Sequence, residues 1–160
     1  MFVVCFAVAS SIAQAKMVGA GYGILAPGCT NCTSLSGFNL FGGMAVNDKI
    51  VATLNLGFFS KTDGAASLNS TAIGISGDYY LKEALNGFFV GPDLTYIMIN
   101  EKINGTEVFS QNNLTIGINA GWAIALGESW RLVPHFGYGT WYDNSSGRLT
   151  AGLKVGYVLP

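Results

Sequence analysis

The sequence predicts an all-β fold, an eight-stranded antiparallel up-and-down barrel that crosses a membrane. Three features predict it. Within each hydrophobic segment, apolar and polar residues alternate with a period near two. The gaps between segments alternate long and short, as when strands are joined by long loops on one membrane face and tight turns on the other. Finally, the chain is hydrophobic, yet after its N-terminus it has no run of roughly 18 apolar residues that could form a transmembrane helix.

The composition limits the class of protein. Only 11% of the 160 residues are charged, the formal net charge is −1 and the mean hydropathy is +0.41. Soluble domains carry about 25% charged residues, and a closed barrel is the alternative to helices that satisfies the backbone within lipid. The 22 glycines suit strands better than helices. The length indicates one domain, and the near-neutral charge gives no reason to expect a nucleic-acid partner.

The N-terminal segment has the pattern of an export signal. The apolar run Phe2 to Ala9 is followed, after three residues, by Ala13-Gln14-Ala15, an A-x-A cleavage pattern. We therefore expect a signal peptide at residues 1–15 and a barrel domain at residues 16–160, although no Lys or Arg precedes Phe2. The alternative is an additional N-terminal strand.

The cysteines indicate a structural role. Cleavage would remove Cys5 and leave Cys29 and Cys32 in C-x-x-C spacing. This spacing occurs in redox motifs and in half of a zinc site, but the chain has neither a βαβ pattern nor a second cysteine pair. In an exported protein we expect a small loop disulfide between Cys29 and Cys32, with two free thiols as the alternative. We expect no metal site and no cofactor.

The periodic segments define about eight strands. They are expected at 16–26, 38–46, 50–59, 70–81, 88–100, 112–126, 131–142 and 148–159. Long extracellular gaps are expected at 27–37, 60–69 and 101–111, a loop at 143–147, and periplasmic turns at 47–49, 82–87 and 127–130. With an even number of strands, both ends of the barrel domain lie on the periplasmic side.

The two faces of the strands differ. One face carries Leu54, Leu56, Phe58, Ile73, Ile75, Leu94, Leu114, Ile116, Ile118, Trp122, Phe136, Leu153 and Val155, whereas the other carries Gly, Thr, Asn and a few charges. We expect the apolar face to contact lipid, because a narrow barrel has little room inside and a charge at mid-bilayer would cost about 2–4 kcal/mol. The alternative is a soluble lipocalin-like barrel that binds an apolar ligand.

Several residues depart from this alternation. Phe41, Val51, Phe89, Ile97, Ile99 and Trp141 fall on the polar face. Either they lie beyond the bilayer or the register shifts near them. Pro92 and Pro134 each remove a ladder hydrogen bond, and we expect both near the periplasmic rim, where a bulge is tolerated.

Charged residues on the polar face form the candidate site. Asp78, Asp93, Arg131, His135 and Lys154 share this face on four predicted strands. Because buried charges must be paired, we expect a salt-bridge network that plugs the lumen. The alternative is a polar path for ions or a small solute. His135 is the only histidine, and no motif joins it to Ser76, Asp78 or Asp93, so we expect no catalytic residues and no enzyme activity.

Two segments carry a resemblance to known proteins. Asp78-Tyr79-Tyr80 followed by Asn86-Gly87-Phe88-Phe89-Val90-Gly91-Pro92 resembles a paired-strand segment of an uncharacterised bacterial outer-membrane family. Gly152-Leu153-Lys154-Val155-Gly156-Tyr157 resembles the C-terminal insertion signal read by the barrel assembly machinery. The chain as a whole resembles the small outer-membrane β-barrel proteins of Gram-negative bacteria, with the architecture of the OmpX and OmpA barrels.

The resemblance implies the barrel fold and a location in the bacterial outer membrane. We expect a monomer that contacts membrane lipid and lipopolysaccharide and is inserted by the barrel assembly machinery. We expect a structural or surface-interaction role in which the extracellular loops, around Asn31, Asp63 and Asn104, contact a ligand or partner. The alternative function is a narrow pore or small-solute transporter. A lipid-modifying enzyme and a soluble ligand-binding barrel are more distant alternatives.

Overall fold

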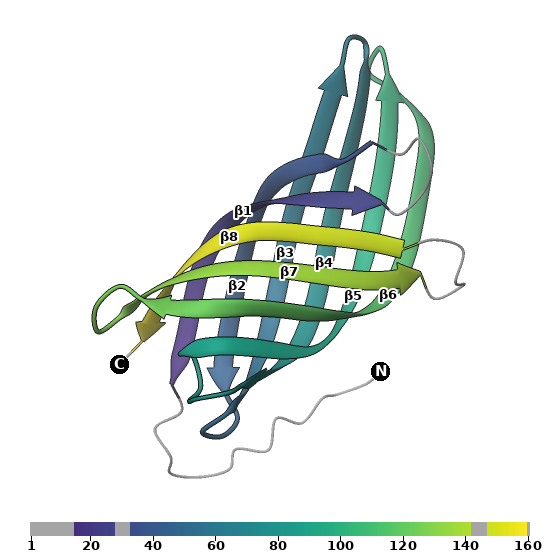
Figure 1. The fold of residues 1–160 in the computed structure, drawn as a ribbon. Coiled ribbons are helices and arrows are strands. Elements are labelled where there is room, and N and C mark those ends of the chain that lie inside the picture. The colour runs from purple at the N-terminus through teal and green to yellow at the C-terminus, as the bar shows by residue number, and fades with distance from the viewer. Residues whose placement is uncertain (1–14, 28–32, 142–146, 160) are drawn as a thin grey trace, which may run out of the picture.

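The computed structural model describes residues 15–27, 33–141 and 147–159, which form one closed antiparallel barrel (Figure 1). Its strands are β1 (Lys16–Pro27), β2 (Leu35–Ala45), β3 (Ile50–Asp63), β4 (Ala66–Tyr80), β5 (Gly87–Ile103), β6 (Thr106–Ala125), β7 (Trp130–Trp141) and β8 (Gly147–Leu159). Each strand pairs with its neighbours in sequence, and β8 closes the barrel against β1. The predicted fold class is confirmed. Among the described residues, no helix is long and apolar enough to cross a membrane.

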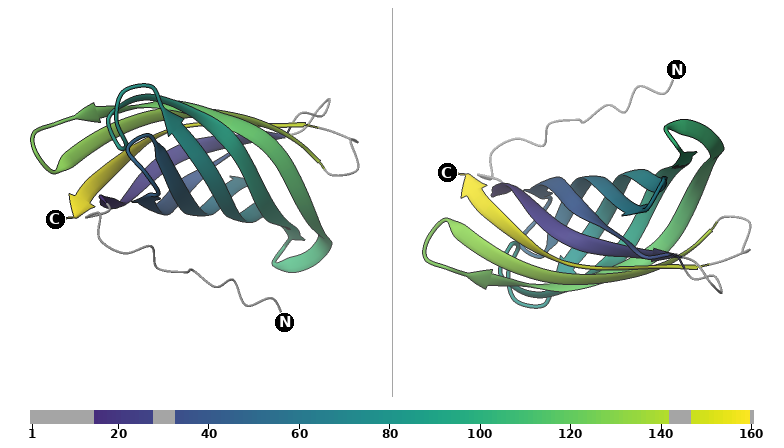
Figure 2. Two further views of the ribbon diagram at one scale, coloured as in Figure 1. Left: turned by 90° about the horizontal axis from the view of Figure 1, so that it is seen from below. Right: turned by 90° about the horizontal axis from the view of Figure 1, so that it is seen from above.

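The two ends of the barrel differ. β1 begins and β8 ends at one end, together with the short connections at 46–49, 81–86 and 126–129, which we call the tight-turn end. The opposite end carries the β3–β4 and β5–β6 hairpins, and we call it the hairpin end. Figure 1 shows these two hairpins extending well beyond the neighbouring strands, and Figure 2 shows the β5–β6 hairpin standing apart from the other strands at this end.

The structure corrects two of the predicted loops. Residues 60–69 and 101–111, expected as long gaps, are for the most part paired strand: β3 and β4 run to Asp63 and Ala66, and β5 and β6 run to Ile103 and Thr106. The prediction depended on apolar alternation, which stops where both faces of a strand contact water. Residues 106–112 are all exposed, yet their backbone pairing continues.

Two-residue turns close both long hairpins. Asn104 and Gly105 both have positive φ, at 51° and 81°. A type I′ turn requires this conformation, and the Asn-Gly pair adopts it readily. In the other hairpin, Gly64 has a φ of 56°. Of the positions that the sequence indicated as loops, Asp63 is therefore the last residue of β3 and Asn104 belongs to the two-residue turn between β5 and β6.

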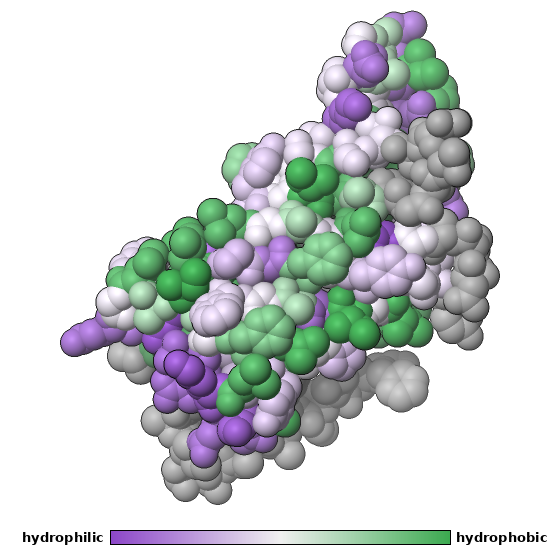
Figure 3. Space-filling view, viewed as in Figure 1, coloured by the Kyte–Doolittle hydropathy of each residue, from purple (hydrophilic) through white to green (hydrophobic). Residues whose placement is uncertain are grey.

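The apolar face lies on the outside of the barrel, as predicted. Leu54, Ile75, Ile116 and Ile118 are 54–61% exposed although they sit in the middle of their strands. Figure 3 shows hydrophobic residues gathered along the barrel wall and hydrophilic residues at the hairpin tips. Such a belt is typical of a barrel surrounded by hydrocarbon.

Two apolar layers fill the lumen, one near each end. The layer at the tight-turn end contains Met17, Phe41, Val51, Tyr80, Leu85, Phe89, Ala123 and Val133. The layer at the hairpin end contains Leu25, Leu35, Phe59, Ala72, Ile97 and Trp141, with Ile99 packed against it. The residues that departed from the alternation therefore lie inside the barrel, in or against these layers. A register shift occurs close to one of them, between Glu101 and Lys102 near Ile99.

Glycines opposite the aromatic rings leave room in the lumen for the apolar layer at the tight-turn end. A Cβ atom added to Gly121 would lie 2.5 Å from Cζ of Phe89, and one added to Gly19 would lie 2.6 Å from Cε1 of Phe41. Both distances are far below van der Waals contact. The lumen of an eight-stranded barrel holds few large side chains, and these glycines leave the volume that the rings occupy.

Candidate functional site: a closed polar lumen and two projecting hairpins

A polar chamber lies between the two apolar layers. Along β3 the inward residues run from Val51 in one layer through Thr53 and Asn55 to Phe59 in the other. Along β5 they run from Phe89 through Asp93 and Thr95 to Ile97. The chamber encloses a cavity of about 110 Å³, and the polar residues that line it are Asn39, Thr53, Asn55, Ser76, Asp78, Asp93, Thr95, Asn119, His135, Arg148, Thr150 and Lys154.

A buried ion pair crosses the chamber. Nη2 of Arg148 lies 2.5 Å from Oδ2 of Asp93, and the two side chains are 7% and 13% exposed. The same Nη2 donates to Oγ1 of Thr95 over 3.0 Å, and Oγ1 of Thr95 donates to Oδ2 of Asp93 over 2.7 Å. Within the described ranges this is the only salt bridge. Its extra hydrogen bonds are what a buried pair needs to offset the loss of hydration.

The other two charged groups have neutral hydrogen-bond partners. Oδ2 of Asp78 accepts hydrogen bonds from Oγ1 of Thr53 at 2.8 Å and from Oγ of Ser76 at 3.3 Å. The ammonium of Lys154 donates to Oδ1 of Asn55 over 2.8 Å and lies 5.1 Å from the centre of the Phe41 ring. The chamber thus contains two carboxylates and two cations, so its charges balance.

Several buried polar atoms in the chamber have no protein partner among the described residues. They are Oδ1 of Asn39, Oδ1 of Asp78, Oδ1 of Asp93, Oδ1 of Asn119, Nδ1 of His135 and Nε of Arg148. Buried polar groups are normally hydrogen-bonded, to internal water where protein groups are out of reach. A water molecule takes up about 30 Å³ in the liquid, so the cavity has room for water beside these atoms.

Arg131 lies apart from this chamber. Its Nε donates to the backbone carbonyl of Leu85 over 2.9 Å, and its Nη1 donates to the carbonyls of Gly127, Glu128 and Trp130 over 3.0–3.3 Å. Arg131 therefore joins the β4–β5 connection to the β6–β7 connection at the tight-turn end. Of the five predicted network residues, Asp78, Asp93, His135 and Lys154 line the chamber, and Arg131 does not.

Arg148 is the charged residue that the sequence analysis missed. Alternation within β8 places positions 148, 150, 152 and 154 on one face. The assignment of Lys154 to the inward face therefore also predicted an inward position for Arg148. The residue was overlooked because it follows a predicted loop directly. Cys29 and Cys32, the candidate disulfide, lie outside the described residues, as does most of the predicted signal peptide.

The projecting hairpins form a second candidate site. The far part of the β5–β6 hairpin exposes three large apolar side chains, Ile103 at 43%, Val108 at 54% and Phe109 at 46%. Close to the tip of the β3–β4 hairpin, a cleft of about 320 Å³ is lined by Thr33, Lys61, Asp63, Ala66, Ser67, Leu68 and Glu101. Exposed apolar side chains rimmed by charged groups are typical of an interaction surface.

Comparison with known proteins identifies the fold. No protein-family model and no curated protein sequence matches the chain. Among solved structures, Ail, the attachment invasion locus protein of Yersinia pestis, matches with a TM-score of 0.67 and 12% identity over 91% of this chain and 99% of that chain. The fold is that of the small outer-membrane barrels.

Two further structures agree with this assignment. Neisserial surface protein A matches with a TM-score of 0.67 and 15% identity over 90% of this chain and 96% of that chain. The N-terminal β-barrel domain of Pseudomonas aeruginosa OprF matches with a TM-score of 0.67 and 16% identity over 91% and 97%. At identities this low, the similarity shows the fold alone.

Proposed function

We propose that this protein is an integral protein of the bacterial outer membrane whose β3–β4 and β5–β6 hairpins bind a partner at the cell surface. The apolar outer belt supports membrane insertion, because it leaves large aliphatic side chains exposed along the barrel wall. The tight-turn end then faces the periplasm and the hairpin end faces outward, following the usual arrangement of such barrels.

The observation that carries the proposal is the pair of apolar layers. They close the lumen on both sides of the polar chamber, and Ile97 and Val51 within them are 0% and 1% exposed. A lumen closed in this way favours an anchoring role over a pore. With the lumen closed, the extended hairpins are the part of the barrel that is available to contact other molecules.

By analogy, the structural neighbours support a role in binding at the cell surface. Ail is described as an attachment invasion locus protein and the Neisserial barrel as a surface protein. Both names describe roles at the cell exterior. The hairpin of this chain would contribute a rigid paired backbone that needs little ordering on binding, which lowers the entropic cost of complex formation.

We further propose that the polar chamber stabilises the barrel and performs no chemistry. A hydrolytic site needs a nucleophile hydrogen-bonded to a general base. Ser76 does donate to the Asp78 carboxylate, but over 3.3 Å and to an oxygen that Thr53 already approaches to 2.8 Å, inside a lumen closed on both sides. Nδ1 of His135 has no hydrogen-bond partner among the described residues. Arg148 and Asp93 neutralise one another, which fits a structural pair.

The proposal is tested by cross-linking in intact outer membranes. A photoreactive amino acid replaces Phe109 near the far end of the β5–β6 hairpin. In a matched variant it replaces Leu126, which is also exposed (54%, against 46% for Phe109) but lies at the tight-turn end. We expect adducts with a surface molecule from position 109 and not from position 126. Adducts from position 126 alone would contradict the proposal, as would an absence of adducts from position 109.

A further inference from the structure

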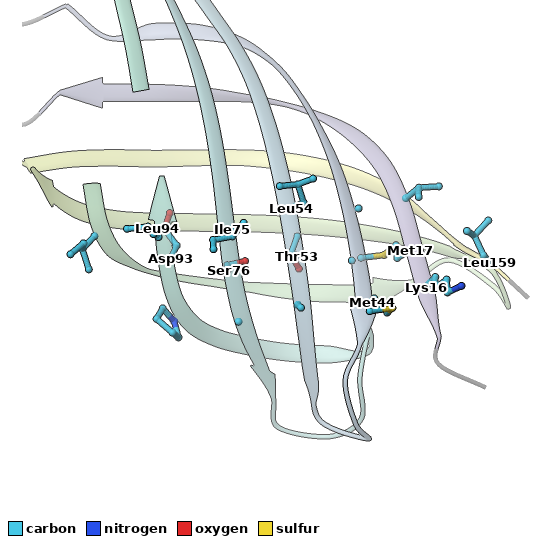
Figure 4. A pocket seen from close by; sticks show the side chains of 17 residues that line it. Lys16, Met17, Met44, Thr53, Leu54, Ile75, Ser76, Asp93, Leu94 and Leu159 are labelled. Carbon is cyan, nitrogen blue, oxygen red and sulfur yellow. The ribbon is translucent and has the colours of Figure 1, made fainter. Parts of the chain in front are cut away.

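The outer wall of the barrel carries a hollow of about 820 Å³ near the tight-turn end (Figure 4). We call it the outer furrow. Two adjacent rows of outward residues define it. The upper row consists of Leu94, Ile75 and Leu54, and the lower row consists of Gly77, Ala52, Met44 and Lys16. Figure 4 shows Leu94, Ile75 and Leu54 on neighbouring strands, with Met44 and Lys16 toward the other side of the hollow.

Strand register explains why the furrow is continuous. Leu94 pairs with Ile75, and Ile75 pairs with Leu54, so the upper row crosses β5, β4 and β3 directly. In the lower row Gly77 pairs with Ala52, Ala52 with Met44, and Met44 with Lys16. The rows therefore run side by side across the strands rather than along one of them.

Small residues make the wall hollow at this point. A Cβ atom added to Gly77, or to Gly42 beside Leu54, would meet no atom within 4 Å. Ala52 adds only a methyl group between Gly77 and Met44. The rims are formed by long side chains, since Leu54 is 57% and Ile75 56% exposed. The furrow is therefore open and lined mainly by apolar residues.

One charge faces outward at the furrow. Lys16 is exposed at the start of β1, where the lower row ends. Asp93 also lines the hollow, but its carboxylate is paired with Arg148 inside the barrel. The furrow thus combines a long apolar trough with one cationic side chain at its tight-turn end. A molecule with an apolar chain and an anionic head complements both parts.

We propose that the outer furrow binds one phospholipid of the periplasmic leaflet, with an acyl chain along the two rows and the phosphate against Lys16. This inference rests on the proposed outer-membrane location, which places the tight-turn end in the periplasmic leaflet. A lipid supplies the apolar chain and the anionic head in one molecule. A second copy of this chain would present its own apolar belt, whose leucine and isoleucine side chains project from the wall, instead of a single chain that can lie in the hollow.

The test uses the purified full barrel in nanodiscs of phosphatidylethanolamine and phosphatidylglycerol, transferred to native mass spectrometry. Ala52→Leu fills the furrow, and Lys16→Gln removes the charge. The matched controls are Ala151→Leu, on the outward face of β8, and Lys61→Gln, on the β3–β4 hairpin. Heat-dependent electrophoretic mobility confirms that each variant forms a closed barrel.

We expect the wild-type barrel and both controls to retain one phosphatidylglycerol. Lys16→Gln should weaken retention about fivefold, the effect of one lysine beside an anionic surface, and Ala52→Leu should abolish it. Equal retention in all five proteins would overturn the inference, as would a dimer that Ala52→Leu dissociates. Neither result would bear on the hairpins, whose failure as a binding surface would appear only in the cross-linking experiment.

Discussion

Arg131 holds the β4–β5 connection over the tight-turn end of the barrel by donating from Nε to the backbone carbonyl of Leu85, over 2.9 Å. Leu85 has a φ of 62°, and its side chain is 1% exposed within the apolar layer. A left-handed conformation at a non-glycine residue costs of order 1–3 kcal/mol. Here burial of the leucine side chain and the bond from Arg131 offset that cost. Through Leu85, the β4–β5 connection therefore helps to close the lumen at the tight-turn end.

Loss of the Arg131 side chain should loosen this closure. We expect Arg131→Gln to lower the free energy of unfolding by about 1–3 kcal/mol, because the Leu85 carbonyl loses its charged donor. Urea titration of the refolded barrel in lipid vesicles measures the change. Lys82→Gln, an exposed substitution in the same connection, serves as the control and should change stability by less than about 0.5 kcal/mol. Equal effects of the two substitutions would contradict the anchoring role of Arg131.

The Arg148–Asp93 pair should behave as a buried unit. Asp93→Leu alone should destabilise the barrel by about 3–5 kcal/mol, because it leaves the Arg148 guanidinium buried without a counter-charge. Arg148→Met combined with Asp93→Leu should recover most of that loss, since a pair of apolar residues of similar volume is often neutral. A double-mutant cycle from urea titrations gives the coupling. Additive effects of the two single substitutions would show that the pair is not coupled.

Deletion of a lumen side chain from the hairpin-end layer should cost more than deletion of one at a hairpin tip. Ile97 is 0% exposed, so Ile97→Ala should destabilise the barrel by about 2–5 kcal/mol. Val108 is 54% exposed in β6, and Val108→Ala should change stability by less than about 0.5 kcal/mol. Unfolding midpoints of the two variants provide the comparison. Similar midpoints would mean that the layer is loosely packed.

His135 should be dispensable for membrane lipid chemistry. Its Nδ1 has no hydrogen-bond partner among the described residues, and neither serine nor aspartate in the chamber is bonded to it there. We expect His135→Ala to leave the acyl composition of outer-membrane lipids unchanged. Mass spectrometry of lipids from a strain carrying the variant provides the measurement. A changed acyl profile in that strain, with normal amounts of the folded barrel, would point instead to an enzyme.

The sequence predicted the features that repeat along the chain. Alternation with a period of two gave the number of strands and the outward face, because residues such as Leu54 and Ile75 must face hydrocarbon on every second position. It also placed Asp93 and Lys154 inward. These predictions succeeded because membrane and lumen impose opposite requirements on the two faces of each strand.

Features that depend on pairing between distant residues were not predicted. The extensions of β3–β4 and β5–β6 carry no apolar alternation, since water lies on both sides of residues 106–112. The apolar lumen layers looked like exceptions, because Phe41 and Phe89 meet Gly19 and Gly121 across neighbouring strands, and this match depends on the strand register. The inward turn at Leu85 depends on Arg131, which lies 46 residues away.

Single-channel recording of the purified protein in planar bilayers tests the closed lumen most directly. We predict no stepwise conductance from the wild-type barrel, because apolar layers close both sides of the polar chamber. A variant with small residues in both layers, Phe89→Ala with Ile97→Ala, should produce conductance steps if it remains heat-modifiable on gels. Regular steps from the wild-type protein, altered in size by Asp93→Asn, would contradict the account and identify the chamber as a conducting path.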